Sequence, residues 1–353
     1  MNSFGRQTVY RILDANFNRG REALRVLEEY CRFALNDESL TETTKNLRHE
    51  LANAAQDEEL GDGLCQSRDI VRDVGASVSA GDEYVRADTQ AVATAAAKRA
   101  AEAIRSIEEY AKAVSSVRVA KRAESIRYQL YELERRIGLL ARARRVFGHV
   151  RLYVIITESY CSGRWQDVAA AAIRGGAECL QLREKGLSDR ELLSRAREFV
   201  RICRDGGALA VINDRCDIAI AAEADGVHIG QDDMPIDVVR GLLPPAMLLG
   251  VSTHTAAQAV SVSGAALDYV AIGPMFSTDT KPRDFVAGIE VLAEVRSSIR
   301  LPVVAIGGID ANRAPGVVAA GADCLCVCTS VIASEEVEVR ARQIRAMMEQ
   351  SEV

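Results

Sequence analysis

The chain has 353 residues, of which 48% are hydrophobic and 27% charged, and its formal net charge is −6. This length predicts two domains, and the hydrophobic fraction is ample for a buried core. The charge gives no indication of nucleic-acid binding, no apolar run is long enough for a membrane span, and the first residues do not resemble a signal peptide. We therefore expect a cytoplasmic protein whose partners are neither nucleic acids nor membranes.

Residues 1–145 have the apolar period of helices, and they repeat themselves. The segment EALRVLEEYCRFA at 22–34 matches EAIRSIEEYAKAV at 102–114, and NLRHEL at 46–51 matches SIRYQL at 125–130. A duplicated pair of helices packs naturally as a four-helix bundle. We therefore predict an all-α helical-bundle domain over residues 1–145.

Charged residues recur at the same places in both repeats. Their spacing is that of salt bridges within a helix: Arg21, Arg25, Glu28 and Glu29 in the first repeat, and Arg105, Glu108 and Glu109 in the second. We interpret them as a solvated face or a buried ion network. Two alternatives stay open, namely a site for an anionic ligand or partner, and a domain that serves only to form a homo-oligomer. The residues do not identify the function of this domain.

The nine cysteines mostly lie inside apolar runs. Cys324, Cys326 and Cys328 alternate along one predicted strand, which places them on one face as small buried hydrophobes. We favour burial over a metal site made by these three, because no C-x-x-C pair accompanies them. Free thiols are typical of a reducing compartment.

Eight short apolar runs recur in the second half of the chain, and stretches of helical period separate most of them. The runs are Leu152–Thr157, Cys179–Glu184, Ala208–Asp214, Gly226–Gly230, Met247–His254, Tyr269–Phe276, Pro302–Ile309 and Cys324–Ile332. Alternating strands and helices predict a parallel sheet, and eight such units fit an α/β protein of the (β/α)8, or TIM barrel, type. We therefore predict a barrel domain over residues 146–353, with its active site at the carboxyl ends of the strands.

Polar residues follow the predicted strands. They are Gln181, Arg183 and Lys185; Asn213 and Asp214; Asp232 and Asp233; Ser252, Thr253 and His254; Thr278, Thr280 and Lys281; Gly307 and Gly308; and Thr329 and Ser330. Gln181, Arg183 and Lys185 alternate, so a strand would aim all three at one face. A guanidinium and an ammonium at one place indicate an anion site, although a solvated strand end would carry the same residues.

Six motifs in this half resemble the thiamine-phosphate synthase family. They are QLREK at 181–185, IND at 212–214, DGVHIGQDD at 225–233, GVSTH at 250–254, PMFSTDTK at 274–281 and AIGGI at 305–309. The resemblance covers roughly residues 150–335. It implies a transferase of alkyl groups other than methyl, which joins 4-amino-2-methyl-5-(diphosphooxymethyl)pyrimidine to 4-methyl-5-(2-phosphoethyl)thiazole or its 2-carboxy form. The family uses magnesium, releases diphosphate through a dissociative pyrimidine cation and yields thiamine phosphate.

The resemblance assigns the magnesium to Asp214 and Asp233. Magnesium is commonly held by one or two carboxylates together with substrate phosphates, and both residues follow neighbouring strands. Two alternatives stay open: each aspartate caps the helix that follows it, or Asp232 takes the place of Asp233.

The resemblance also assigns the substrate contacts. The predicted catalytic residues are Arg183, Lys281 and Ser252. The predicted substrate-binding residues are Gln181, Leu182, Arg183, Glu184, Lys185, Asn213, Ser252, Thr278, Thr280, Lys281, Gly308, Cys328 and Thr329. A dissociative reaction needs positioning and charge stabilisation more than acid–base groups. Accordingly, we favour a structural role for His254 over a rim contact.

A second anion site is needed for the thiazole phosphate. Gly307 and Gly308 leave backbone N–H groups open to close approach, and the alternating Thr278 and Thr280 would aim two hydroxyls at one phosphate. The family has Val-Ser where this chain has Cys328-Thr329, and threonine keeps the hydroxyl. The glycine pair also suits a simple tight turn.

Two other functions are alternatives for the whole chain. One is a thiazole tautomerase, a barrel isomerase similar to the synthase, and the other is a non-catalytic ligand sensor with a helical interaction domain. The retained set of Asp214, Asp233, Arg183, Lys185 and Lys281 argues against both.

Overall fold

The structure is a computed structural model that describes residues 3–68, 85–277 and 285–349. The chain divides into two compact units at residues 141 and 142, within one long helix. No helix in the described ranges has the length and apolar character needed to cross a bilayer.

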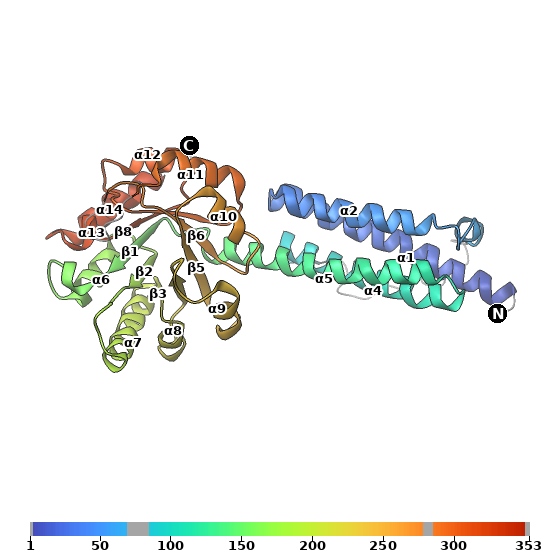
Figure 1. Cartoon of the computed structure of the whole chain (residues 1–353), viewed down its shortest axis with the longest axis horizontal. Coiled ribbons are helices and arrows are strands. Elements are labelled where there is room, and N and C mark those ends of the chain that lie inside the picture. Colours follow the sequence, from blue (N-terminus) through green and yellow to red (C-terminus); the bar gives the residue numbers. More distant parts are fainter. Residues whose placement is uncertain (1–2, 69–84, 278–284, 350–353) are drawn as a thin grey trace. The chain divides into compact units, whose positions relative to one another are not determined.

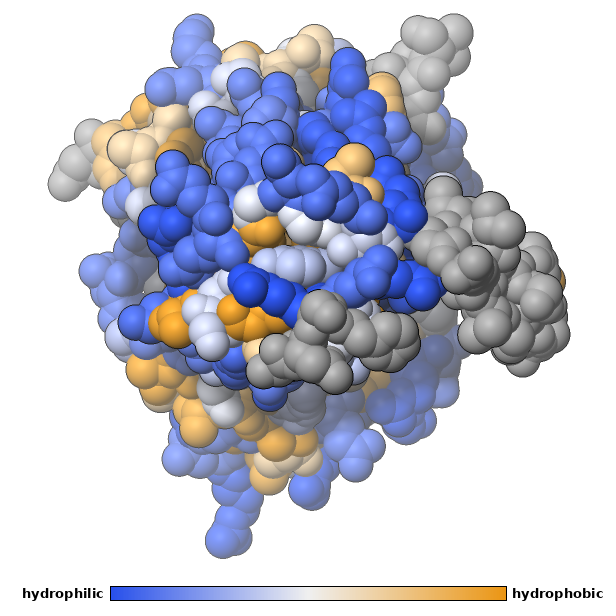
Figure 2. All heavy atoms as spheres, turned by 90° about the vertical axis from the view of Figure 1, so that its right-hand side faces the viewer, coloured by the Kyte–Doolittle hydropathy of each residue, from blue (hydrophilic) through white to orange (hydrophobic). Residues whose placement is uncertain are grey.

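The first unit is helical throughout its described residues (Figure 1). Its elements are α1 (Ser3–Glu29), which continues into a short π-helix (Tyr30–Ala34), α2 (Glu38–Ala55), α3 (Gly63–Gln66), α4 (Thr89–Ala113) and α5 (Val117–Val146). Asp37 and Asp88 begin α2 and α4, since each carboxylate accepts a hydrogen bond from a backbone N–H three residues on, at 2.7 Å. The face shown in Figure 2 is mostly hydrophilic, and its hydrophobic residues lie in separate small groups.

A row of alanines lets α4 approach α1 closely. Ala93, Ala96, Ala97, Ala100 and Ala103 of α4 are all buried. Gly20 of α1 lies at this contact, where an added Cβ would stand 2.8 Å from the Leu51 side chain and 3.7 Å from Ala103. Small residues at the crossing therefore set the spacing of the helices.

The two repeats form equivalent ion pairs. Glu28 accepts from Arg25 at 3.1 Å and from Arg48 of α2 at 2.8 Å. At the matching place, Glu108 accepts from Arg105 at 2.7 Å and from Arg127 of α5 at 3.0 Å. The carboxylates of Glu28 and Glu108 are buried. The interpretation as a buried ion network is therefore confirmed for Glu28 and Glu108, whereas Arg25 and Arg105 are about half exposed, as on a solvated face. Each network ties two helices of one repeat together.

The second unit is a closed barrel of eight parallel strands in sequential order, with helices outside it (Figure 1). The strands are β1 (Leu152–Ile156), β2 (Cys179–Leu182), β3 (Leu209–Asn213), β4 (Gly226–Ile229), β5 (Leu248–Thr253), β6 (Tyr269–Ile272), β7 (Val303–Ile306) and β8 (Cys324–Val327). The helices are a 3-10 turn (Glu158–Tyr160), α6 (Trp165–Arg174), α7 (Asp189–Gly206), α8 (Cys216–Ala221), α9 (Ile236–Leu242), α10 (Ala256–Val262), α11 (Gly288–Ser298), α12 (Ala314–Ala319), α13 (Thr329–Ile332) and α14 (Val337–Glu349). The predicted fold class, a (β/α)8 barrel after a helical bundle, is confirmed.

Each predicted strand begins within one residue of the observed strand, and five predicted ends lie within two residues of it, but the other three lie three or more residues too far along. The run Cys324–Ile332 is a strand only as far as Val327, because Thr329 begins α13. The runs Tyr269–Phe276 and Pro302–Ile309 also pass beyond β6 and β7. Pro274 lacks an N–H for a ladder, and Gly307 and Gly308 have left-handed φ values, so the strands end before them.

Aromatic rings and thiols fill the barrel core. Phe147 stacks on Tyr269 with ring centroids 4.1 Å apart and 11° between the planes. Cys179, Cys324 and Cys326 are buried in the same cluster, which confirms the predicted burial of Cys324 and Cys326. The same prediction is wrong for Cys328, which is only half-buried because it follows the end of β8. Burial raises the pKa values of these three core thiols far above their usual range.

Candidate active site

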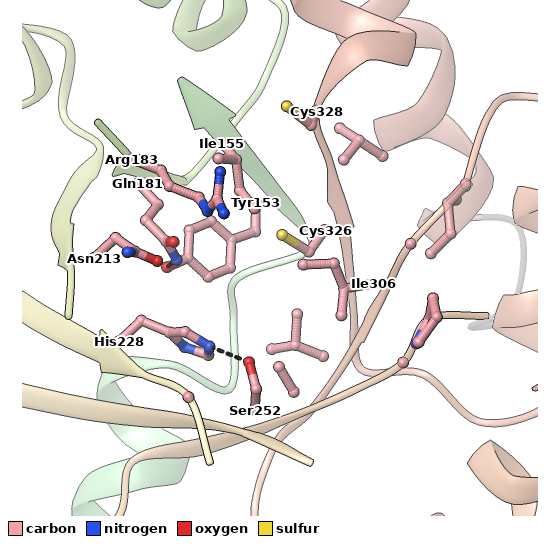
Figure 3. A pocket seen from close by; sticks show the side chains of 18 of the residues that line it. Tyr153, Ile155, Gln181, Arg183, Asn213, His228, Ser252, Ile306, Cys326 and Cys328 are labelled. Atoms are coloured by element: carbon pink, nitrogen blue, oxygen red, sulfur yellow. Dashed lines mark hydrogen bonds between the residues drawn. The ribbon is translucent and has the colours of Figure 1, made fainter. Parts of the chain in front are cut away.

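A cavity of about 780 Å³ lies at the carboxyl ends of the barrel strands. Predicted site residues that line it are Gln181, Arg183, Lys185, Asn213, Asp214, Asp233, Ser252, Gly308, Cys328 and Thr329. In Figure 3, Gln181, Arg183 and Asn213 project from neighbouring strands toward the same space. Side chains far apart in the sequence are thus gathered at one rim, as the (β/α)8 topology requires.

The end of β2 carries charge into this cavity. Gln181 is buried, Arg183 is half-buried and Lys185 is exposed. Lys185 forms a short ion pair with Asp214 at the end of β3. Asp214 has a left-handed backbone with φ of 61°, which aspartate tolerates better than most residues, and its N–H donates to the His228 carbonyl at 2.8 Å. The backbone therefore holds this carboxylate at the rim.

Neither predicted metal ligand is a helix cap. The residue before α8 is Arg215, and the residue before α9 is Pro235. The capping alternative for Asp214 and Asp233 is therefore wrong. Asp233 closes a tight turn, in which its carboxylate accepts from the Gly230 N–H at 2.6 Å. Asp232 lines the same cavity.

The donor set fits a hard divalent cation that is completed by substrate. Asp214 and Asp233 offer carboxylate oxygens to one cavity, and Asn213 lies beside them. Among the described residues, no group of three or more His, Cys, Asp or Glu is placed to hold a metal ion. A cation held here would take its remaining ligands from phosphates and water, which is the usual arrangement for magnesium.

Of the predicted contacts that the structure describes, two lie outside the cavity lining. Leu182 is 1% exposed and packs in the barrel wall. The Glu184 carboxylate accepts from Arg195 at 3.1 Å and from the Glu158 N–H at 2.8 Å. Both alternate with Gln181, Arg183 and Lys185, so their side chains take the opposite face of the strand.

The glycine pair after β7 turns the chain and packs closely against the segment that follows β6. Gly307 and Gly308 have φ values of 101° and 66°, and an added Cβ would stand 2.6 Å from Pro274 and 2.8 Å from the Ser277 carbonyl respectively. Only glycine fits both positions. Beside them, Arg313 donates to the Gly308 carbonyl at 2.7 Å, and its guanidinium lies over the Phe276 ring at 4.9 Å.

The end of β8 adds two hydroxyls to the same rim. Thr329 and Ser330 line the cavity. Among the described residues, the Ser330 hydroxyl is the buried side-chain oxygen without a hydrogen-bond partner. A buried hydroxyl without a partner is costly, so it marks a place where a ligand oxygen is expected. Burial raises the pKa of the neighbouring Cys328 to about 12.

Sequence reasoning missed a chain of polar groups beneath the cavity. Gln181 donates to the Tyr153 hydroxyl at 2.6 Å, and that hydroxyl lies 3.1 Å from the hydroxyl of Tyr269. The Tyr269 hydroxyl is 3.0 Å from His228 Nδ1, and His228 Nε2 is 2.8 Å from Ser252 Oγ, the contact dashed in Figure 3. His228 lies within the quoted motif DGVHIGQDD, so its polar ring on a buried strand was the available signal.

The remaining predicted positions are His254 and three residues after β6. His254 lines the cavity, and its Nδ1 lies 2.6 Å from the Gly273 carbonyl oxygen. Thr278, Thr280 and Lys281 lie outside the described residues. Arg313 was missed because it follows the glycine pair in a stretch that carries no motif.

Fold and site together define a (β/α)8 barrel protein whose cavity, at the carboxyl ends of the strands, is lined by both cationic and carboxylate side chains. Residues 152–331 match the family described as "Thiamine monophosphate synthase", and residues 11–136 match the "ThiD2 family". Curated thiamine-phosphate synthases of Thermosynechococcus vestitus and Rhodopirellula baltica are 37% and 38% identical to this chain. Those matches span 98% and 97% of it, and 97% and 93% of the relatives.

A solved structure agrees with these matches. The thiamine phosphate pyrophosphorylase of Pyrococcus furiosus is 32% identical with a TM-score of 0.54, and the match covers 57% of this chain and 97% of that one. The chain belongs to the thiamine monophosphate synthase family. It is accordingly an enzyme, a transferase of class EC 2.5.1.3, and it forms thiamine phosphate in thiamine biosynthesis.

Proposed function

We propose that the enzyme joins 4-amino-2-methyl-5-(diphosphooxymethyl)pyrimidine to 4-methyl-5-(2-phosphoethyl)thiazole or its 2-carboxy form. The bond between the methylene carbon and the diphosphate oxygen breaks, and the electron pair leaves with diphosphate. The thiazole nitrogen then bonds to the methylene carbon of the pyrimidine cation. With the 2-carboxy substrate, the carboxylate is lost as carbon dioxide.

One observation carries this proposal: the cavity gathers Arg183, Lys185, Asp214 and Asp233 at one rim. A departing diphosphate needs positive charge around it, and the two carboxylates suit magnesium. Bound there by Asp214 and Asp233, magnesium would neutralise charge on the diphosphate. Arg183 has a planar fork of donors that matches phosphate oxygens, and Lys185 is a compact point charge beside it.

The remaining groups position the substrates. Asn213 would hold the diphosphate or the pyrimidine, and Ser252 would contact the pyrimidine ring. The Gln181 amide nitrogen donates to the Tyr153 hydroxyl, so we place Gln181 beneath the pyrimidine ring. Lys281 is proposed as a further diphosphate contact, and the hydroxyls of Thr278 and Thr280 are proposed as contacts to the thiazole phosphate.

We place the thiazole phosphate against the rim formed after β7 and β8. The left-handed backbone of Gly307 and Gly308 lets a phosphate approach closely. The Ser330 hydroxyl has no partner among the described residues, and Thr329 lies next to it. Arg313 adds a guanidinium at the same edge, which makes it an additional candidate contact.

The proposal extends to the organisation of the chain. We assign residues 146–353 to the synthase domain and residues 1–145 to a separate, duplicated helical domain. Small molecules would be its substrates, and we propose a cytoplasmic enzyme with no nucleic-acid partner.

Product analysis tests the proposed reaction directly. Purified enzyme is incubated with the pyrimidine diphosphate, with and without thiazole phosphate and magnesium, and both diphosphate and thiamine phosphate are measured. We expect thiamine phosphate in a 1:1 ratio to released diphosphate, and only in the complete mixture. Conversion of the thiazole phosphate without diphosphate release would favour a tautomerase instead.

A further inference from the structure

The chain of hydrogen bonds beneath the cavity has a direction that its buried partners determine. It runs through Gln181, Tyr153, Tyr269, His228 and Ser252, which come from five different strands. The exposed fractions of Gln181, Tyr153, Tyr269 and His228 are 3%, 1%, 0% and 6%. Gln181, Tyr153 and His228 line the cavity, but almost none of their surface is accessible to water, and Tyr269 lies behind the lining. Each donor therefore needs an acceptor within the protein.

The number of protons available determines which hydroxyl donates at the Gln181 end of the chain of hydrogen bonds. A phenol carries one proton and can donate only once. The Tyr153 oxygen already accepts from the Gln181 amide nitrogen at 2.6 Å. Within residues 3–68, 85–277 and 285–349, the remaining polar partner of this hydroxyl is that of Tyr269, at 3.1 Å. Tyr153 must therefore donate to Tyr269, since the opposite choice would leave a buried O–H without an acceptor.

The same counting of protons determines which ring nitrogen of His228 carries the proton. The Tyr269 oxygen accepts from Tyr153, so its own proton goes to His228 Nδ1 at 3.0 Å. Nδ1 then has no proton, and in the neutral ring the proton lies on Nε2. Nε2–H donates to Ser252 Oγ at 2.8 Å. The Ser252 hydroxyl oxygen therefore accepts from His228, and its own proton can be donated to a group in the cavity that Ser252 lines.

We propose that Tyr269, which accepts a hydrogen bond from Tyr153 and donates its own proton to Nδ1, holds His228 in the Nε2–H tautomer, so that Ser252 meets the substrate as a hydrogen-bond donor. Tyr153, Tyr269 and His228 are then positioning residues, and they determine specificity at Ser252. The substrate group facing Ser252 must be an acceptor, such as an unprotonated ring nitrogen, and an amino group is excluded there. This reading rests on the proposed function only in identifying that acceptor as part of the pyrimidine.

Steric features fix the two tyrosines in this arrangement. Gly250 lies directly opposite Tyr269 in the strand register, and the Tyr269 ring lies over it. Phe147 stacks on the ring with centroids 4.1 Å apart. The ring is thus packed against both a glycine and an aromatic residue, and its hydroxyl lies within hydrogen-bond distance of both Tyr153 and His228. The hydrogen-bond direction therefore depends on a rigid part of the core.

Histidine tautomers can be measured without turnover. Full-length enzyme with 15N-labelled histidine is examined by long-range proton–nitrogen correlation, which separates Nδ1 from Nε2. The chain has four histidines, so a spectrum of His228→Gln identifies the relevant signals. We expect the Nε2–H tautomer for His228 in the unmodified enzyme. A proton on Nδ1 would overturn the inference while leaving the proposed reaction intact.

Two variants of matched size test the direction. Tyr269→Phe removes the donor to Nδ1, so we expect averaged nitrogen shifts from a mixture of tautomers. Tyr153→Phe removes the donor to Tyr269 but leaves the Tyr269 proton on Nδ1, so the His228 signals should stay those of the Nε2–H form. Equal loss of the tautomer in both variants would contradict the proposed direction.

Substrate analogues test the outcome at Ser252. Pyrimidine diphosphates with one ring nitrogen replaced by C–H are compared in the unmodified enzyme and in Ser252→Ala. We expect one analogue to lower kcat/KM about tenfold in the unmodified enzyme, because it removes the acceptor for Ser252. The same replacement should have little effect in Ser252→Ala. An equal penalty in both enzymes would show that Ser252 does not donate to the ring.

Discussion

Replacing Gly250 by alanine should damage the barrel core and its polar chain together. A Cβ at this position would stand 2.0, 2.4 and 2.5 Å from three ring atoms of Tyr269, where ordinary contacts begin near 3.4 Å. The ring would have to withdraw by about 1.4 Å, but Phe147 stacks on it at 4.1 Å. A withdrawal of that size would lengthen the Tyr269 hydrogen bonds of 3.1 and 3.0 Å beyond bonding range.

Overpacking of this kind, together with broken buried hydrogen bonds, should cost about 3 kcal/mol of unfolding free energy. For a barrel of this size, that loss corresponds to a fall of about 6–12 °C in Tm. Thermal unfolding followed by near-UV circular dichroism measures it. The matched control is Gly241→Ala in α9, where an added Cβ meets nothing within 4 Å. An unchanged Tm and an unchanged His228 tautomer in Gly250→Ala would refute the reasoning.

Four further outcomes are expected. Asp214→Asn keeps a residue that tolerates the left-handed backbone, yet magnesium titrations of activity should need about tenfold more metal, because one of two carboxylates is lost. Burial raises the pKa of Cys328 to about 12, so iodoacetamide at pH 8 should modify the exposed Cys65 first, as peptide mass spectrometry would show. Burial alone would raise the pKa of Glu108, but hydrogen bonds from Lys112, Arg105 and Arg127 lower it below its ordinary value of 4.5. The ionised Glu108 should therefore stabilise the fold at neutral pH, and this contribution should be lost when the pH falls through the lowered pKa, as the unfolding free energy measured across an acid titration would show. Residues 147–353 expressed alone should fold and form thiamine phosphate, and a folded but inactive fragment would show that the helical domain completes the site.

The sequence predicted the barrel well because its signals are local. Strand starts follow from apolar runs, and the rim residues follow from the rule that parallel strands end at one edge. Leu182 and Glu184 show the limit of a motif: they belong to QLREK, yet alternation turns their side chains away from the cavity. A motif identifies a segment, whereas the pleat decides which of its residues face the site.

Long-range features were beyond the sequence. Tyr269 and His228 are 41 residues apart, and no periodicity indicates that they meet beneath the cavity. Gly250 belongs to the motif GVSTH, but the need for glycine there comes from the Tyr269 ring of the next strand, which leaves no space for a side chain. Arg313 reaches the rim through a carbonyl of the glycine turn. Such contacts require three-dimensional register, which local patterns do not contain.

Both helical pairs of the duplicated unit lie in one chain, and this makes their association independent of protein concentration. Two separate helical pairs of this kind would assemble only as far as their concentration allowed. Here both pairs, with Glu28 in one and Glu108 in the other, belong to one chain, so their association is intramolecular. The assembly is then independent of dilution, and its two halves are present in a fixed 1:1 ratio. Because the halves are no longer encoded by one sequence, either can change alone, as the glycine at residue 20 and the alanine at its counterpart, residue 100, already show.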